Sequence, residues 1–416
     1  MSALTEIIRA EIAGRGAIPF ARFMELALYC PDYGYYERES VTVGRHGDFY
    51  TSVSVGSLFG ELLALQFAEW LEKIPNDRVQ IVEAGAHDGK LALDIMRWLK
   101  RWRPEVFARV EYVLVEPSSR RRAWQEKTLG ELAGKVRWLN SSKLNGNEKI
   151  RGIIFANELL DAMPVHRLGW DAKKREWFEW GVALKAERFD WVKMRRSVGL
   201  NLNSEEDSTG GTRDNGERTG WSRHWKGAGY PSFNWPSASV SVSSVPSCSS
   251  VSEFGLKKLG SLPGELLEVL PDGFTTEICP AAEDWWSSAA QSLKAGKLMT
   301  LDYGAHNEAG LSPNHPNGTV RAYHRHKICD DILANAGKQD ITVNVDFQAI
   351  QQVGEAMGLR TEAFVSQSQF LTGIASRLMA GGNESGEWSP KKSRELQTLI
   401  HPEHLGRAFR VLVQSR

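Results

Sequence analysis

The fold of this protein can be predicted from the segment Val79-Gln80-Ile81-Val82-Glu83-Ala84-Gly85-Ala86-His87-Asp88-Gly89. Its first half is a short β-branched run, which is typical of a buried strand, and Leu91 to Lys100 has helical spacing. A turn from strand to helix needs glycine where the backbone takes a positive φ or approaches a ligand closely. Glu83-x-Gly85-x-x-x-Gly89 therefore predicts a ligand-binding turn, although glycines that serve turn geometry alone would give the same pattern.

The same alternation of strand and helix continues outward from this turn. Apolar runs predict strands at Tyr112–Glu116, Lys135–Leu139, Ile153–Asn157 and Leu298–Tyr303, with helices near 91–100, 118–132, 280–294 and 343–357. Helices are also expected at 4–13, 19–29 and 58–71, a loop at 49–57 and an edge strand at 364–371. This order is the signature of an α/β fold with a parallel, Rossmann-like sheet that carries helical N-terminal additions.

Polar residues follow three of the predicted strands. Glu116 ends the strand after the glycine turn, where an acid can accept both hydroxyls of a ribose, or can be a solvated strand-end acid. Asn157, Glu158 and Asp161 follow a further strand and are expected to face the same crevice, although an N-cap with an acid in the first turn would explain one of them. His87-Asp88 occupies the place where a pyrophosphate would need free amide donors, so a ligand without phosphate is expected.

Composition narrows the class of protein. The 416 residues are 42% hydrophobic, as in ordinary globular proteins. Their formal net charge is zero, which gives no electrostatic reason to expect nucleic acid as a partner. Four scattered cysteines (Cys30, Cys248, Cys279, Cys329) form no C-x-x-C pair, and the spacing of His315, His324 and His326 favours loop or core histidines over a metal site. With no signal peptide and no run of about 18 apolar residues, a cytoplasmic protein without a membrane span is expected.

The stretch from Ser197 to Pro263 is dense in Ser, Gly, Asn and Thr. Such a composition buries too little apolar area to offset chain entropy, so a flexible insertion is expected. Anchoring of this insertion through Trp221, Trp225 and Trp235 is the alternative.

The sequence resembles the MidA-type methyltransferases, bacterial and mitochondrial proteins whose mitochondrial member helps assemble respiratory complex I. The resemblance is carried by Pro31–Tyr36, Gly47–Ser52, Phe59–Glu61, Asn157–Val165, Glu277–Pro280, Asp302–Gly304, Gly318–His326, Val345–Phe347 and Gln367–Leu371. It covers nearly the whole chain outside the Ser-rich stretch.

The resemblance implies a class I methyltransferase sheet, S-adenosylmethionine as cofactor, and arginine methylation of a respiratory NADH dehydrogenase subunit. Carried over by position, Gly85 and Gly89 belong to the cofactor turn, Glu116 to the ribose and Asn157 to the methionine part. Glu83, at the end of the strand before the turn, can hydrogen-bond within a structural network or to a cationic amino group of the ligand. Gly47, Asp48, Thr51 and Ser52 match the segment that closes over the site. A eukaryotic, already processed member would lie in the mitochondrial matrix.

Two departures from the family pattern stand out. The usual Leu-Gly-Pro-Gly-Arg-Gly turn is here Ala84-Gly85-Ala86-His87-Asp88-Gly89, and Val53-Ser54-Val55 stands where Pro-Glu is usual. The expected division is 1–75 (helical segment closing over the cofactor), 76–195 (first part of the cofactor domain), 196–263 (insertion) and 264–416 (remainder with substrate-binding additions).

An arginine substrate needs carboxylates that hold the guanidinium as it loses a proton, because that group is protonated at neutral pH. Glu158 and Asp161 are the candidates, with Glu277 third, and His326 is an alternative general base. Three other functions remain open: an assembly chaperone without catalysis, a small-molecule methyltransferase and a nucleotide-dependent oxidoreductase. The last lacks the glycines that cradle phosphate.

Overall fold

The computed structural model describes residues 2–38, 51–75, 78–139, 144, 149–194, 259, 262–305, 315–324, 327–380, 388–403 and 405–416. The expectations for Gly47, Asp48, His326 and almost all of the Ser-rich stretch lie outside these residues.

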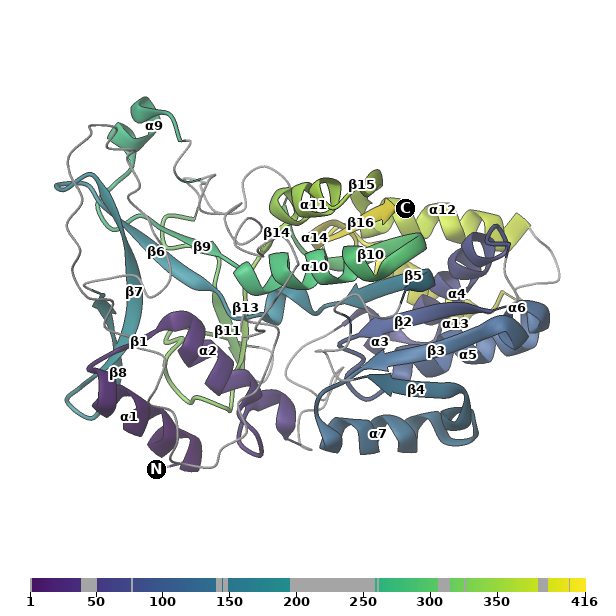
Figure 1. Cartoon of the computed structure of the whole chain (residues 1–416), viewed down its shortest axis with the longest axis horizontal. Helices are drawn as coiled ribbons and strands as arrows, with labels where there is room; N and C mark the ends of the chain where they lie inside the picture. The colour runs from purple at the N-terminus through teal and green to yellow at the C-terminus, as the bar shows by residue number, and fades with distance from the viewer. Residues whose placement is uncertain are drawn as a thin grey trace, which may run out of the picture.

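An eight-stranded sheet forms the larger half of the protein, at the right of Figure 1. Its order is β15-β16-β10-β5-β2-β3-β4, and β14 pairs with β10. The bounds are β2 Val79–Ala84, β3 Val110–Val115, β4 Val136–Leu139, β5 Ile150–Asn157, β10 Leu293–Ala305, β14 Val345–Asp346, β15 Arg360–Ser366 and β16 Phe409–Ser415. Strands β4, β3, β2, β5 and β10 are parallel, and β16 pairs antiparallel with both β10 and β15. The predicted Rossmann-like α/β class is confirmed.

Helices cover both faces of this sheet, because its strands alternate their side chains between two cores. Ile81 of β2 belongs to one core and Val82 to the other. The first core is closed by α4 Leu58–Leu71, α5 Lys90–Trp102, α12 Gln367–Ala380 and α13 Pro390–Ile400. The second is closed by α10 Pro280–Ser292 and α11 Phe347–Ala356. The remaining helices of this half are α3 Ser52–Val55, α6 Pro104–Arg109, α7 Ser119–Leu129, η2 Gly130–Lys135 and α14 Leu405–Ala408.

The other half carries a second sheet, which the sequence pattern did not predict. Its order is β1-β7-β6-β9, with β8 on β7, and its pairs are antiparallel. The bounds are β1 Ile18–Pro19, β6 His166–Asp171, β7 Glu176–Lys185, β8 Arg188–Lys193 and β9 Thr275–Ile278. Residues 166–193 thus leave the parallel sheet, although they fall within the 76–195 part expected to belong to it.

Two N-terminal helices pack on this second sheet, at the left of Figure 1. They are α1 Ala3–Arg15 and α2 Phe20–Tyr29, both close to prediction. A third sheet, β12-β11-β13, contributes to the hydrophobic core that α1 and α2 also form. The remaining bounds are η1 Tyr35–Glu37, η4 Leu160–Ala162, α9 Gly264–Val269, β11 Arg321–His324, β12 Lys327–Cys329 and β13 Asp340–Thr342.

Three predicted elements differ from the structure. Residues 52–55 of the expected loop are helical, because the side chain of Thr51 caps α3 by accepting from the backbone N–H of Ser54 at 3.1 Å. The expected edge strand over 364–371 ends at Ser366, where α12 begins. Helix α11 begins at Phe347 rather than at residue 343, because Asp346 caps it.

Candidate active site

The carboxyl ends of three neighbouring parallel strands open into one cavity of about 1750 Å³. Ala84 of β2 pairs with Val115 of β3 and with Ala156 of β5, so the residues that follow each strand meet at one edge. The residues that line this cavity include many of those that the sequence analysis named, together with Asp340, which it did not name. They are Thr51, Glu83, Gly85, His87, Glu116, Asn157, Glu158, Asp161, Tyr303 and Asp340.

The glycine turn has the backbone that its sequence predicts. Gly85 and Gly89 have φ of 76° and 84°. A Cβ atom at Gly85 would lie 3.0 Å from the Leu159 side chain, and one at Gly89 would lie 3.3 Å from Cα of Gln125. Both positions therefore require glycine for conformation and for space. His87 also has a positive φ of 46°, which a side chain tolerates only at a cost.

Glu83 lies at the base of this turn and is 2% exposed. Its Oε2 accepts a hydrogen bond from the hydroxyl of Tyr112 at 2.5 Å. Burial raises the pKa of the Glu83 carboxyl to about 8. This residue therefore belongs to a buried hydrogen-bond network and also lines the cavity.

Glu116 follows β3 and is held by several donors. Its Oε1 accepts from the backbone N–H of Ser118 at 2.9 Å and from Nε of Arg121 at 3.0 Å. Its Oε2 accepts from Nε2 of Gln125 at 3.1 Å. Because Oε1 is the more heavily bonded atom, Oε2 retains more capacity to accept a bond from a ligand.

Asn157 and Glu158 bring the N-terminal segment to the end of β5. Oε1 of Glu158 accepts from Nδ2 of Asn157 at 3.1 Å and from the backbone N–H of Ser52 at 3.2 Å. Ser52 also donates through its hydroxyl to Gln367 at 3.0 Å. The Oδ1 atom of Asn157 is buried and has no hydrogen-bond partner in the described part of the chain. An acceptor in this state suits a ligand that carries an amino group.

Glu158 has a strained backbone and an altered acidity. Its φ is 51°, and its N–H donates to the carbonyl of Leu301 at 2.9 Å. Burial, together with the charge of Asp302, raises the pKa of the Glu158 carboxyl to about 8. Non-glycine residues in this conformation persist only where the surroundings hold them, and they are concentrated at functional sites.

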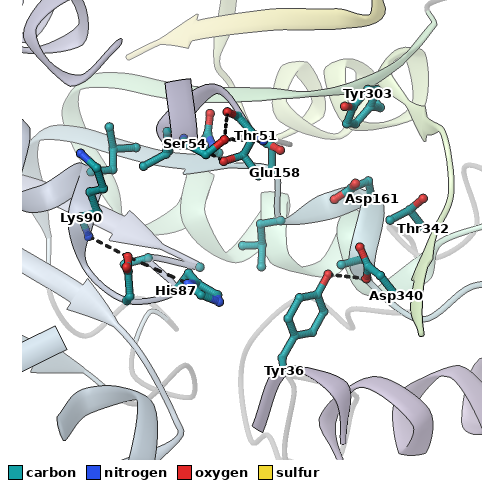
Figure 2. Close-up of a pocket in the computed structure, with 18 of the residues that line it drawn as sticks. Tyr36, Thr51, Ser54, His87, Lys90, Glu158, Asp161, Tyr303, Asp340 and Thr342 are labelled. Carbon is teal, nitrogen blue, oxygen red and sulfur yellow. Dashed lines mark hydrogen bonds and ion pairs between the residues drawn. The ribbon is translucent and has the colours of Figure 1, made fainter. Parts of the chain in front are cut away.

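A group of acids, which we call the acidic group, consists of Glu158, Asp161, Asp302 and Asp340 (Figure 2 labels all but Asp302). Asp161, Asp302 and Asp340 are 5%, 0% and 2% exposed. Burial and the neighbouring carboxyls raise the pKa of Asp161 well above its usual range. Within the described chain, no lysine or arginine forms an ion pair with Glu158, Asp161 or Asp302.

The sequence did not single out Asp302 and Asp340 as site residues. Asp302 lies in β10, and its Oδ2 accepts the backbone N–H groups of Leu159 and Leu160 at 3.2 and 2.8 Å, which shapes the turn that carries Asp161. An acid near the end of a parallel strand was the available signal for Asp302. Asp340 lies in the separate small sheet, where nothing local marks it.

Glu277 lies apart from this group. It forms an ion pair with Arg167 at 3.3 Å, and its Oε2 accepts the backbone N–H of Thr319 at 2.8 Å. It does not line the large cavity. The structure therefore places it in the second sheet, on β9 beside Arg167 of β6, and not in the cavity lined by Glu158 and Asp161.

The other expectations from composition concern metals and membranes. Over the described ranges, no three histidine, cysteine or acidic side chains are grouped as metal ligands. Nδ1 of His324 donates to the carbonyl of Lys338 at 2.8 Å. No helix in the described part is long and apolar enough to cross a membrane.

Comparisons with known proteins agree with this geometry. Two proteins named as mitochondrial and one protein of known structure are similar to this chain over most of its length. A Drosophila melanogaster protein named "Protein arginine methyltransferase NDUFAF7 homolog, mitochondrial" is 25% identical over 85% of this chain and 70% of its own. The Xenopus laevis protein "Protein arginine methyltransferase NDUFAF7, mitochondrial" is 24% identical over 98% and 83%. A crystal structure of a Burkholderia thailandensis protein bound to S-adenosyl-homocysteine is 27% identical, covers 100% of this chain and 92% of that one, and has a TM-score of 0.74.

The family itself is shown by a match to residues 62–365, more than half of the chain. Its description is "Putative S-adenosyl-L-methionine-dependent methyltransferase". The positive φ of Gly85 and Gly89, the acid after β3 and the unpartnered amide oxygen of Asn157 suit this cofactor, which carries a ribose and an amino group. The chain belongs to this family of S-adenosyl-L-methionine-dependent methyltransferases.

Proposed function

We propose that this protein transfers a methyl group from S-adenosylmethionine to the guanidinium of an arginine in a protein substrate. The observation that carries the proposal is the acidic group, in which buried carboxyls adjoin the cofactor turn and raise one another's pKa. A cation placed among them would relieve their mutual repulsion, and a planar guanidinium matches paired carboxylate oxygens. The names of the Drosophila and Xenopus relatives support the same acceptor.

On this proposal, the cofactor is held by the strand ends. The turn at Gly85 and Gly89 allows the close approach of backbone, Oε2 of Glu116 accepts from the ribose, and Oδ1 of Asn157 accepts from the amino group. Thr51 lines the cavity and Ser52 donates to Glu158, which supports the role of their segment in closing the site. The same role for Gly47 and Asp48 rests on the family resemblance alone.

The bound cofactor supplies a methyl group on a sulfonium sulfur, and an in-line displacement of this kind depends mainly on positioning. Glu158 pins the guanidinium in the proposed site, since Ser52 and Asn157 fix its Oε1 and the strained backbone aims the side chain. Asp161 holds the far side of the guanidinium. As the new N–C bond forms, the nitrogen loses a proton, and Glu158 is placed to accept it.

The cationic acceptor also fits the altered acidity of the site. A carboxyl with a pKa of about 8 is mostly protonated at pH 7 and must ionise to bind a cation. The raised pKa makes Glu158 a better proton acceptor than an ordinary glutamate, because a general base works best when its pKa lies near the working pH. The same residue can therefore bind the guanidinium and receive its proton.

For the protein substrate, we propose a subunit of respiratory NADH dehydrogenase, on the strength of the family resemblance. The test is incubation of the purified protein and labelled S-adenosylmethionine with lysate from a strain that lacks it, followed by mass spectrometry. Label on an arginine of an NADH dehydrogenase subunit supports the proposal. Label confined to small molecules overturns it, and binding of the cofactor without any label favours a chaperone of the same fold.

A further inference from the structure

Glu37 reaches the ribose acid from a segment that is distant in the sequence. It ends η1, and its side chain is 4% exposed against the start of α7. Its Oε2 accepts from the hydroxyl of Ser118 at 2.8 Å, and its Oε1 lies 3.1 Å from Nη1 of Arg121. Ser118, through its backbone N–H, and Arg121, through its guanidinium, hold Oε1 of Glu116, so the four residues close a ring.

The ring determines which carboxylate oxygen each guanidinium nitrogen of Arg121 contacts. Arg121 is 6% exposed, and its guanidinium lies between the carboxylates of Glu37 and Glu116. Both Nε and Nη2 of Arg121 contact the same atom, Oε1 of Glu116, at 3.0 and 2.9 Å. An arginine beside a single carboxylate prefers to span both of its oxygens. Here the remaining nitrogen, Nη1, forms an ion pair with Oε1 of Glu37 at 3.1 Å without a hydrogen bond to it, and Oε2 of Glu116 is left to Gln125 and the cavity.

We propose that Glu37 is a positioning residue for the cofactor: by holding Nη1 of Arg121, it keeps Oε2 of Glu116 available to the ribose hydroxyls. Without Glu37, the fork of Arg121 can span both oxygens of Glu116 and compete with the ligand. Glu37 does not touch the cofactor in this arrangement and acts through Arg121. The inference rests on the proposed role of Glu116 at the ribose.

The test measures binding of S-adenosylhomocysteine and of its 2′-deoxy analogue by calorimetry, with no turnover required. The wild-type protein is expected to prefer the ribose ligand by about tenfold or more, the effect of one hydrogen bond to a charged group. In Glu37→Ala this preference falls toward one, because the ribose ligand loses affinity and the deoxy ligand does not. Glu37→Gln, which keeps the shape and one acceptor, gives a smaller loss and serves if the alanine variant does not fold.

Asp32→Asn is the matched control. Asp32 pairs with Arg120 at 2.5 Å across the same interface, but the pair is exposed and does not touch Arg121. This variant is expected to keep the full preference. A full preference in Glu37→Ala and Glu37→Gln overturns the inference, and so does an equal weakening of both ligands, which would indicate a merely structural role. Glu116→Gln separates the proposals: if it leaves the preference intact, the ribose role of Glu116 fails as well.

Discussion

The backbone N–H of Ser52 donates to Oε1 of Glu158 at 3.2 Å and joins the N-terminal segment to the end of β5. The bond links residues more than a hundred positions apart and fixes the glutamate on the side of the cavity next to the cofactor turn. It leaves Oε2 of Glu158 as the oxygen that would contact the guanidinium of the methyl acceptor.

Glu158→Gln should lower the rate of methyl transfer to an arginine peptide by about 100-fold or more, because an amide neither balances a cation nor accepts its proton. Binding of S-adenosylhomocysteine should stay within about twofold, since the amide can still accept from Ser52. Single-turnover assays and calorimetry measure the two effects. Undiminished turnover with intact cofactor binding would contradict the assignment, and Glu187→Gln, at an exposed hairpin position, is the control.

Binding of an arginine peptide should strengthen as the pH rises from 6 to 8 and then level off. The pKa of Glu158 is raised to about 8, so below that pH the carboxyl must lose a proton before it binds a cation. With one proton released, the dissociation constant falls about tenfold per pH unit. Calorimetry in buffers of different ionisation enthalpy should detect release of about one proton at pH 7, and less in Glu158→Gln. A pH-independent affinity would be the contrary result.

Asp302→Ala should lower the free energy of unfolding by about 3 kcal/mol, because it leaves buried N–H groups of the Leu159–Leu160 turn without an acceptor. Asp302→Asn keeps the shape and should cost less. Ser389→Ala, which removes a helix cap that accepts a single N–H, should cost about 1 kcal/mol. Urea unfolding measures all three variants. A loss for Asp302→Ala no larger than that of Ser389→Ala would show that Asp302 does not shape the turn.

Opposite substitutions in the cofactor turn should have opposite effects on stability. His87→Gly should raise the free energy of unfolding by about 1 kcal/mol, because it relieves a side chain held at φ 46°. Gly89→Ala should lower it by about 1–2 kcal/mol, since φ is 84° and the new methyl lies 3.3 Å from Gln125. Thermal unfolding compares the two variants, and changes of the same sign would mean that backbone strain does not control this turn.

Local patterns were enough to predict the parallel sheet and the cofactor edge of the site. Strand, turn and helix are encoded over short windows, as in Val79–Gly89, and parallel strands bring their carboxyl ends to one edge wherever they lie in the sequence. Gly85, Glu116 and Asn157 could therefore be assigned to one crevice before their contacts were known. Glu277, the third candidate carboxylate, lies instead in β9 of the other sheet.

The Rossmann-like half and its strand-end residues could be predicted from local sequence, because each depends on neighbours within a few positions. The second sheet over 166–193 and the acids around Glu158 became apparent only from the folded protein. Asp340 contacts Tyr36, which lies 304 positions away in the sequence. Glu37 contacts Ser118 and Arg121, which lie about 80 positions away. Contacts of that separation leave no periodic signal in a single sequence, because they depend on how two sheets pack and not on the chain near each residue.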